Sequence, residues 1–182
     1  PGGLPNRLLV QNPDGTVTDR AAEAGVDLLD ETRAALIVDL DNDGAQDMVL
    51  AGWRQLLAYA GDGKGAFEIR AEIAGLFQYS LAAADYDGDG DLDLYACNYS
   101  PKSDKERSDD LGRFGRPVPF HNATNGGRNK LMRQDTGWTF VDVIDEVGMG
   151  PTNNRWSYAA SWKDYDNDAD LALNVANDIG HN

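Results

Sequence analysis

The sequence predicts an all-β protein built from short antiparallel strands. Three observations support this prediction: a nine-residue acidic loop recurs three times, a hairpin with a tight turn also recurs three times, and the segments beside the acidic loops alternate as strands do. A period of two residues is typical of a strand with one buried face. Residues 92–97 show this pattern directly after one acidic loop. The acidic loops therefore connect strands.

The loop at residues 85–93 has the spacing of a calcium-binding loop. Calcium takes about six to eight oxygen ligands, and alternate residues of a tight turn direct their carboxylates into one concavity. Acidic residues occupy loop positions 1, 3, 5, 7 and 9, and Gly90 at position 6 permits a sharp bend. An EF-hand would need glutamate at position 12, where this chain has Ala96. The expected ligands are the side chains of Asp85, Asp87, Asp89 and Asp93 and the main-chain carbonyl of Asp91.

The same loop occurs at residues 39–47 and, in a reduced form, at residues 164–172. In the loop at residues 39–47, four carboxylates within nine residues repel one another unless a cation lies among them. Its expected ligands are Asp39, Asp41, Asp43 and Asp47, with the carbonyl of Ala45. The reduced loop has Ala169 at position 6 and Ala172 at position 9, so turns held by local hydrogen bonds are an alternative explanation for it. If it binds calcium, it should do so weakly, through Asp164, Asp166, Asp168 and the carbonyl of Asp170.

The composition describes an acidic globular chain. It has 182 residues, 41% hydrophobic content and a net charge of −15, and the three loops contain four, five and four of its 31 acidic residues. Nucleic acid is not an expected partner, because binding it requires basic residues that neutralise phosphates. No apolar run approaches the ~18 residues of a membrane span, and Cys97 alone cannot form an intrachain disulfide. Weak calcium loops fill where calcium is near millimolar, which favours an extracellular location.

Two kinds of hairpin alternate along the chain and predict one repeat region over residues 1–182. Glycine-turn hairpins alternate with calcium hairpins, and together they predict four-stranded antiparallel blades of a β-propeller. The expected units are a half-blade at 6–26, a blade at 34–76, a blade at 80–149 and a half-blade at 157–178. A ring closed from these units would have three blades, below the usual range of roughly four to eight. We therefore expect an incomplete propeller, either a piece of a longer protein or a unit that associates with other copies through its open edges.

Residues 100–128 form an insertion into the second predicted blade. The segment is polar and is interrupted by glycine and proline, which predicts a long surface loop. A solvated excursion and a binding loop are both compatible with this pattern, since recognition often lies on long loops of rigid scaffolds.

The chain resembles FG-GAP/VCBS repeat proteins. The resemblance rests on the D-x-D-x-D-G loops, on the strand that follows each loop and on the Asn-x-Leu hairpins, and residues 154–168 resemble the ASPIC/UnbV (cartilage acidic protein-like) subgroup. It extends over nearly the whole chain. It implies an extracellular, calcium-stabilised propeller of the integrin α-subunit type, with calcium ligands at the loop positions named above. It implies no activity, because such repeats serve in adhesion, in assembly and as modules appended to enzymes.

The sequence contains little that indicates catalysis. His121 and His181 are its two histidines, and neither lies in a nucleophile motif. The predicted function is a non-catalytic calcium-binding module for adhesion or extracellular assembly, including complementation of half-blades between chains. Two alternatives stay open: a propeller domain appended to an extracellular enzyme, and a carbohydrate-recognition module. The second would use the tryptophans, which could also serve in packing between blades: Trp53, Trp138, Trp156 and Trp162.

Overall fold

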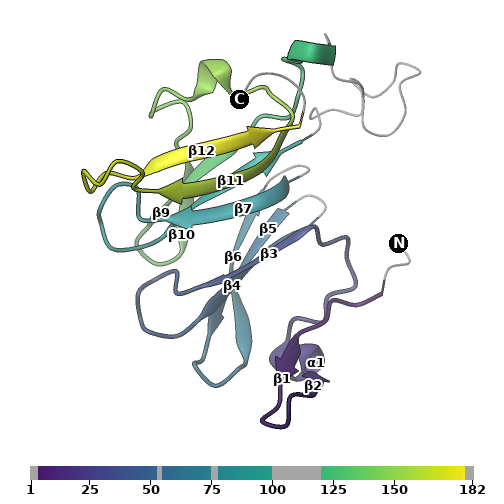
Figure 1. Cartoon of the computed structure of the whole chain (residues 1–182). Coiled ribbons are helices and arrows are strands. Elements are labelled where there is room, and N and C mark those ends of the chain that lie inside the picture. Colours follow the sequence, from purple (N-terminus) through teal and green to yellow (C-terminus); the bar gives the residue numbers. More distant parts are fainter. Residues whose placement is uncertain (1–3, 53–54, 75–77, 100–119, 179–182) are drawn as a thin grey trace.

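The computed structural model describes residues 4–52, 55–74, 78–99 and 120–178 (Figure 1). The protein is all-β, with four antiparallel sheets of two to four strands and one short helix, and the described sheets do not close into a barrel. The predicted fold class, an all-β fold of antiparallel sheets consistent with a partial propeller, is thereby confirmed. The division of the chain into blades and half-blades stays a prediction. None of the helices in the described ranges has the length and apolar character that a membrane crossing requires.

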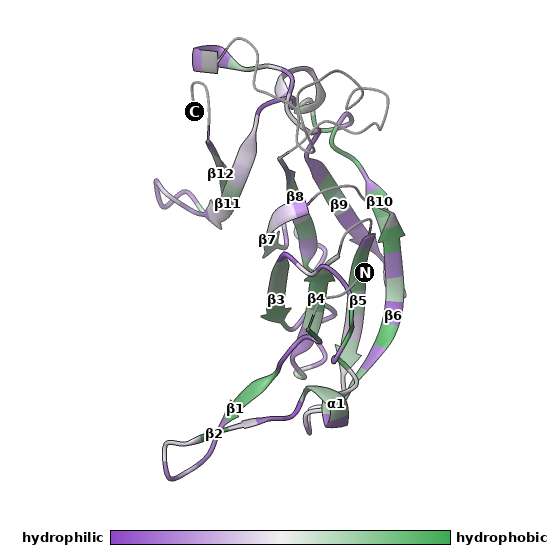
Figure 2. Ribbon diagram, turned by 90° about the vertical axis from the view of Figure 1, so that its right-hand side faces the viewer, coloured by the Kyte–Doolittle hydropathy of each residue, from purple (hydrophilic) through white to green (hydrophobic). Residues whose placement is uncertain are grey.

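Two four-stranded sheets form the centre of the molecule, and in each of them consecutive strands are neighbours. The first sheet contains β3 (Ala34–Val38), β4 (Asp47–Ala51), β5 (Gln55–Gly61) and β6 (Phe67–Ala74). The second sheet contains β7 (Gln78–Ala84), β8 (Asp93–Asn98), β9 (Lys130–Asp135) and β10 (Thr139–Asp142). Figure 2 shows that the two sheets run in the same order across the molecule, from β3 and β7 on one side to β6 and β10 on the other.

Two small sheets flank this centre, one at each end of the arc (Figure 1). Near the N-terminus, β1 (Leu9–Gln11) pairs with β2 (Val17–Asp19). Towards the C-terminus, β11 (Ser157–Lys163) pairs with β12 (Ala172–Asn177). Short 3-10 turns lie before β9 and before β11, at Phe120–Asn122 and Gly150–Thr152.

The alternation of side chains along β8 explains how the second sheet is covered on both faces. Leu94 and Ala96 point to the first sheet and join the cluster that contains Val49 and Leu56. Tyr95 and Cys97 belong to the opposite face, where they join a cluster that Leu173 and Val175 of β12 cover in part. Successive strand residues point to opposite faces, so a single strand supplies both interfaces. The second sheet therefore lies between the first sheet and the β11–β12 sheet.

The outer face of the first sheet packs against the N-terminal segment. Helix α1 (Ala21–Ala24) buries Ala21 and Ala24 against Met48, Leu50 and Tyr59. This helix was not predicted from the sequence, because four residues are too few to show helical periodicity. It ends at Gly25, whose φ of 76° is the left-handed conformation common at helix ends.

Parts of the predicted features lie outside the described residues. Trp53, His181 and residues 100–119 of the predicted insertion are among them. Within the described remainder of the insertion, Ala123 is buried, and Asn122 accepts a hydrogen bond from the Arg155 side chain.

Candidate metal sites

Each acidic loop gathers three of its aspartate carboxylates, at positions 1, 3 and 5 in two of the loops and at positions 1, 3 and 9 in the loop at residues 85–93. We call residues 39–47, 85–93 and 164–172 the first, second and third acidic loops. In each of them, three aspartates place one carboxylate oxygen apiece so that the three oxygens lie within 4.8 Å of one another. The groups are Asp39, Asp41 and Asp43; Asp85, Asp87 and Asp93; and Asp164, Asp166 and Asp168. Oxygen ligands gathered in this way suit a hard cation such as calcium.

The carboxylate at position 1 organises the backbone of every loop. Asp39 accepts hydrogen bonds from the main-chain N–H groups of Asp43 (3.1 Å) and Gly44 (2.9 Å). Asp85 accepts from Gly88, Asp89 and Gly90, and Asp164 accepts from Asn167 and Ala169. These bonds are the local turns that the sequence offered as an alternative for the third loop. They occur in all three loops, so they do not distinguish the third loop from the others.

Positions 4 and 6 of each loop have a left-handed backbone. Position 6 is occupied by Gly44 (φ 91°), Gly90 (φ 102°) and Ala169 (φ 74°). Position 4 is occupied by Asn42, Gly88 and Asn167, with φ between 56° and 78°. Glycine and asparagine are the residues that adopt this conformation most readily. Their presence at position 4 could therefore have predicted the left-handed backbone there, which the spacing of the ligands alone does not indicate. Ala169 adopts the same conformation as the two glycines at the cost of steric strain.

The carboxylate at position 9 anchors the loop to the neighbouring strands. Asp47 is 1% exposed and accepts hydrogen bonds from the N–H groups of Leu40 (2.7 Å) and Gly61 (2.9 Å). Asp93 is equally buried and accepts from the N–H groups of Tyr86 (3.1 Å) and Gln134 (2.8 Å). Position 9 of the third loop is Ala172, which cannot make these bonds. The aspartate at position 9 therefore has a structural role besides its predicted role as a ligand.

The structure gathers some of the predicted ligands more closely than others. The remaining predicted ligands do not belong to the three groups of neighbouring oxygens: Ala45, Asp47, Asp89, Asp91 and Asp170. Ala45, Asp91 and Asp170 are predicted to coordinate through the main chain, and their N–H groups donate to the position-5 carboxylates. Their assignment as ligands stays a prediction.

Burial raises the pKa values of three carboxylates in the first and second acidic loops. Desolvation raises the pKa of Asp93 to about 6, against the hydrogen bonds from Gln134 and Tyr86 that lower it, and the nearby Asp87 and Asp89 raise it further. The pKa of Asp47 is raised in the same direction, again mainly by desolvation. Desolvation and the neighbouring Asp89 and Asp41 raise the pKa of Asp91. A bound cation would offset this accumulation of negative charge.

Asp41 in the first loop provides a test of whether the residues fit a cation. Its Oδ2 accepts a hydrogen bond from the indole Nε1 of Trp138 at 3.1 Å. Its Oδ1 is buried and has no hydrogen-bond partner among the described residues. A buried carboxylate oxygen without a donor is unfavourable, and a cation at the centre of the loop would satisfy it. The donor set and this unsatisfied oxygen fit calcium in the first loop.

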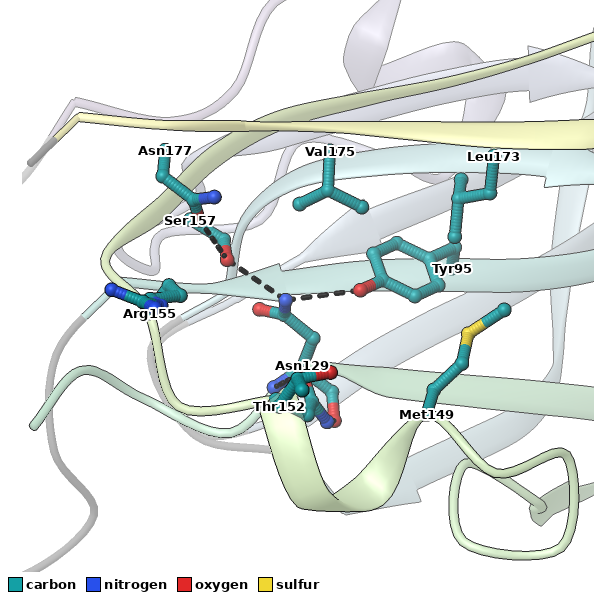
Figure 3. Close-up of a pocket in the computed structure, with 10 residues that line it drawn as sticks. Tyr95, Asn129, Met149, Thr152, Arg155, Ser157, Leu173, Val175 and Asn177 are labelled. Atoms are coloured by element: carbon teal, nitrogen blue, oxygen red, sulfur yellow. Dashed lines mark hydrogen bonds between the residues drawn. The ribbon is translucent and has the colours of Figure 1, made fainter. Parts of the chain in front are cut away.

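A pocket of about 460 Å³ lies beside the second sheet, between β12 and the start of β9 (Figure 3). At its polar end, the Nδ2 of Asn129 donates to the hydroxyls of Tyr95 (3.0 Å) and Ser157 (2.8 Å), and the Ser157 hydroxyl donates to Asn177 (3.0 Å). At its apolar end, Leu173 and Val175 point from β12 towards Tyr95 and Met149. Sequence reasoning missed this network, because its members come from four separate segments.

The fold and the loops together define an all-β repeat protein with acidic loops between paired strands. Residues 39–96 match the family model of the FG-GAP-like repeat, which supports the FG-GAP repeat family for this region. The matched segment runs from the first acidic loop to β8 and includes the second acidic loop. No curated protein matches the chain.

The strain at Ala169 leads to a prediction for the third loop. Ala169→Gly should stabilise the protein by roughly 1 kcal/mol, because it relieves a left-handed conformation that alanine disfavours. Gly44→Ala and Gly90→Ala should destabilise the protein. The backbone at these two glycines has φ angles of 91° and 102°, which alanine disfavours as it does the φ of 74° at Ala169. Thermal unfolding of the three variants without calcium measures these effects. A loss of stability in Ala169→Gly would contradict the strain assigned to this position.

The raised pKa of Asp93 leads to a prediction about pH. The folded protein holds a proton on Asp93 up to about pH 6, whereas the unfolded chain releases it near pH 3.8. Lowering the pH from 7 to 5 should therefore increase the contribution of this group to the stability of the calcium-free protein. Asp93→Asn should remove that contribution. The measurement is the melting temperature of the wild-type protein and of the variant as a function of pH, and the difference between the two pH profiles gives the effect. Parallel pH profiles for the two proteins would show that Asp93 titrates normally.

Proposed function

We propose that the chain is a non-catalytic, calcium-stabilised β-propeller repeat module of the integrin α-subunit type. The observation that carries this proposal is the repeated geometry of the acidic loops, each of which gathers three carboxylate oxygens within 4.8 Å between two paired strands. The match of residues 39–96 to the FG-GAP-like repeat supports it. The run at residues 154–168 favours the ASPIC/UnbV subgroup as the finer assignment.

An extracellular location is part of the proposal. FG-GAP repeats occur in extracellular proteins, and extracellular calcium modules have dissociation constants of roughly 0.1–1 mM. The loops of this chain lie at the surface, where Asp43, Asp87 and Asp168 are exposed, as expected of weak sites that equilibrate with free calcium. The proposed roles are adhesion and extracellular assembly.

The described residues offer little support for catalysis. Cys97 is completely buried, and burial raises the pKa of its thiol to about 12. It is therefore protonated at neutral pH and is a poor nucleophile. The appended-module alternative places catalysis in another part of a longer protein.

The positions of three tryptophans favour packing over carbohydrate recognition. Trp156 is 2% exposed, and its Nε1 donates to Asn125 at 3.1 Å. Trp138 packs against the cluster between the two four-stranded sheets, and Trp162 packs against the cluster on the other face of the second sheet. These contacts support a packing role for the three rings over a carbohydrate platform.

Calcium binding can be tested together with its residue assignment. Calcium should raise the melting temperature, and each site should contribute about 2.7 kcal/mol when the free ion exceeds the dissociation constant a hundredfold. Asp87→Ala should weaken binding more than Asp170→Ala, because Asp87 supplies a gathered carboxylate oxygen and Asp170 is predicted to supply only a carbonyl. Calorimetric titration measures both effects. A flat titration, with a melting temperature indifferent to chelator, would overturn the calcium assignment.

We also propose that the module assembles through the uncovered parts of its end sheets. Within the described chain, β12 pairs only with β11, and its other edge has no partner strand. At the opposite end, the two-stranded β1–β2 sheet exposes Leu9 (52%) and Val17 (60%). An open strand edge and an apolar hairpin are features through which β-proteins associate. Pairing of β1–β2 of one copy with β12 of the next would be a heterologous contact that propagates.

Sedimentation in the presence of calcium tests the assembly proposal. The chain should associate in a concentration-dependent way, and Val17→Lys should weaken that association because it places a charge on the exposed face of β2. Lys64→Ala provides a control on an exposed turn far from both end sheets in the sequence. A monomer at every accessible concentration would overturn the assembly proposal and leave calcium binding intact.

A further inference from the structure

The turn between β9 and β10 reaches the first acidic loop from the neighbouring sheet. Trp138 lies in this turn, and its Nε1 donates to Asp41 Oδ2 at 3.1 Å across 97 residues of sequence. Its ring packs against the apolar cluster between the first and second sheets. Asp41 Oδ1 is buried without a partner among the described residues. The second sheet therefore holds one oxygen of a predicted calcium ligand and leaves the other available.

A second set of hydrogen bonds joins the first acidic loop to the second sheet and its acidic loop. The carbonyl oxygen of Leu40, at position 2 of the first loop, accepts hydrogen bonds from the N–H of Leu92 (2.9 Å) and from Nε2 of Gln134 (3.0 Å). Gln134 is 1% exposed, and its own N–H donates to Asp93, at position 9 of the second loop. One residue of β9 thus contacts both loops. The first loop, which connects two strands of the first sheet, therefore also makes hydrogen bonds to residues of the second sheet and its loops.

We propose that Trp138 is a positioning residue for cation binding at the first acidic loop, so that residues 39–47 bind calcium more tightly when the β9–β10 hairpin of the neighbouring sheet is docked. This inference rests on the proposed calcium function and adds a coupling between the two sheets. Such coupling is reciprocal, so calcium in the first loop also strengthens the contact between the sheets.

The physical basis is the orientation of one carboxylate. An aspartate side chain that rotates freely must lose that freedom when it binds an ion, and a fixed hydrogen bond from the indole reduces this loss in advance. The position of Trp138 supports a specific use of the side chain. Its φ of 64° lies in the left-handed region, which is strained for a bulky residue. Such a conformation persists where surrounding contacts offset its cost. The contacts that hold it are the cluster between the sheets and Asp41.

Trp162 provides a matched control. It stacks on Tyr86 of the second loop with ring centroids 6.5 Å apart and an interplanar angle of 21°. Its Nε1 is buried and has no hydrogen-bond partner among the described residues. Tryptophan to phenylalanine at this position therefore removes an indole N–H next to a loop without removing a hydrogen bond to a carboxylate.

The test is a calcium titration of the 182-residue chain, followed by the amide NMR signals of Gly44 in the first loop and Gly90 in the second. Trp138→Phe should raise the midpoint of the Gly44 titration about tenfold, in line with the effect of removing a group that orients a metal ligand. The Gly90 midpoint should stay within about twofold, and Trp162→Phe should leave the Gly44 midpoint unchanged. In the wild-type protein, the Trp138 indole signal should shift in step with Gly44, which tests the contact without a substitution.

The outcomes separate this inference from the proposed function. An unchanged Gly44 midpoint in Trp138→Phe would overturn the positioning role while calcium binding stands. Equal shifts of Gly44 and Gly90 would also overturn it, because they indicate a general loss of stability. If neither glycine responds to calcium in the wild-type protein, the calcium function itself fails, and the coupling fails with it.

Discussion

The burial of the position-9 aspartate is the constraint that fixes the first and second acidic loops to their sheets and, through them, connects the two sheets. A buried carboxylate is costly unless hydrogen bonds and charges compensate it. Asp93 meets this requirement with N–H groups from its own loop and from β9, and Asp47 does so with N–H groups from its own loop and from the end of β5. Each aspartate therefore fixes an acidic loop to a strand of the same sheet that follows it in the chain. The loops are part of the sheets and are not appended to them.

This anchoring extends from one sheet to the next because Gln134 takes part in two contacts. Its main-chain N–H donates a hydrogen bond to Asp93, and its side-chain Nε2 donates to the carbonyl oxygen of Leu40 in the first loop. The apolar cluster between the sheets lies beside these polar contacts, with Leu40 itself fully buried in it. Apolar burial supplies most of the attraction between two packed sheets, and the polar contacts fix their relative register. A change at a loop can therefore reach the sheet interface through a few directional bonds.

The sequence was sufficient to predict the features that depend on local spacing. The strands beside the loops, the antiparallel hairpins and the gathered carboxylates of Asp39, Asp41 and Asp43 follow from alternation and from the positions of aspartate within nine residues. Contacts between segments far apart in the chain could not be predicted in this way. Trp138 and Asp41 are 97 residues apart, and no local pattern connects them. The helix at Ala21–Ala24 was missed for a different reason, since one turn of helix is formed by packing against Met48 and Tyr59 and shows no periodicity of its own.

The third acidic loop shows what remains when the anchor is absent. It has the same left-handed positions and the same caps from its position-1 aspartate as the other two loops, so the turn itself does not require position 9. With Ala172 in place of aspartate, the loop has no carboxylate that could tie it to a following strand, and β12 has no third strand beside it in the described chain. The hairpin is held mainly by β11, which packs on β7 and β8, and by apolar contacts such as Leu173. An ion in the first or second loop would therefore act on a carboxylate set that is tied to its own sheet, whereas an ion in the third loop would act on a hairpin alone. By this argument the affinities of the proposed calcium sites would depend on the connection of each loop to neighbouring strands as well as on its number of ligands.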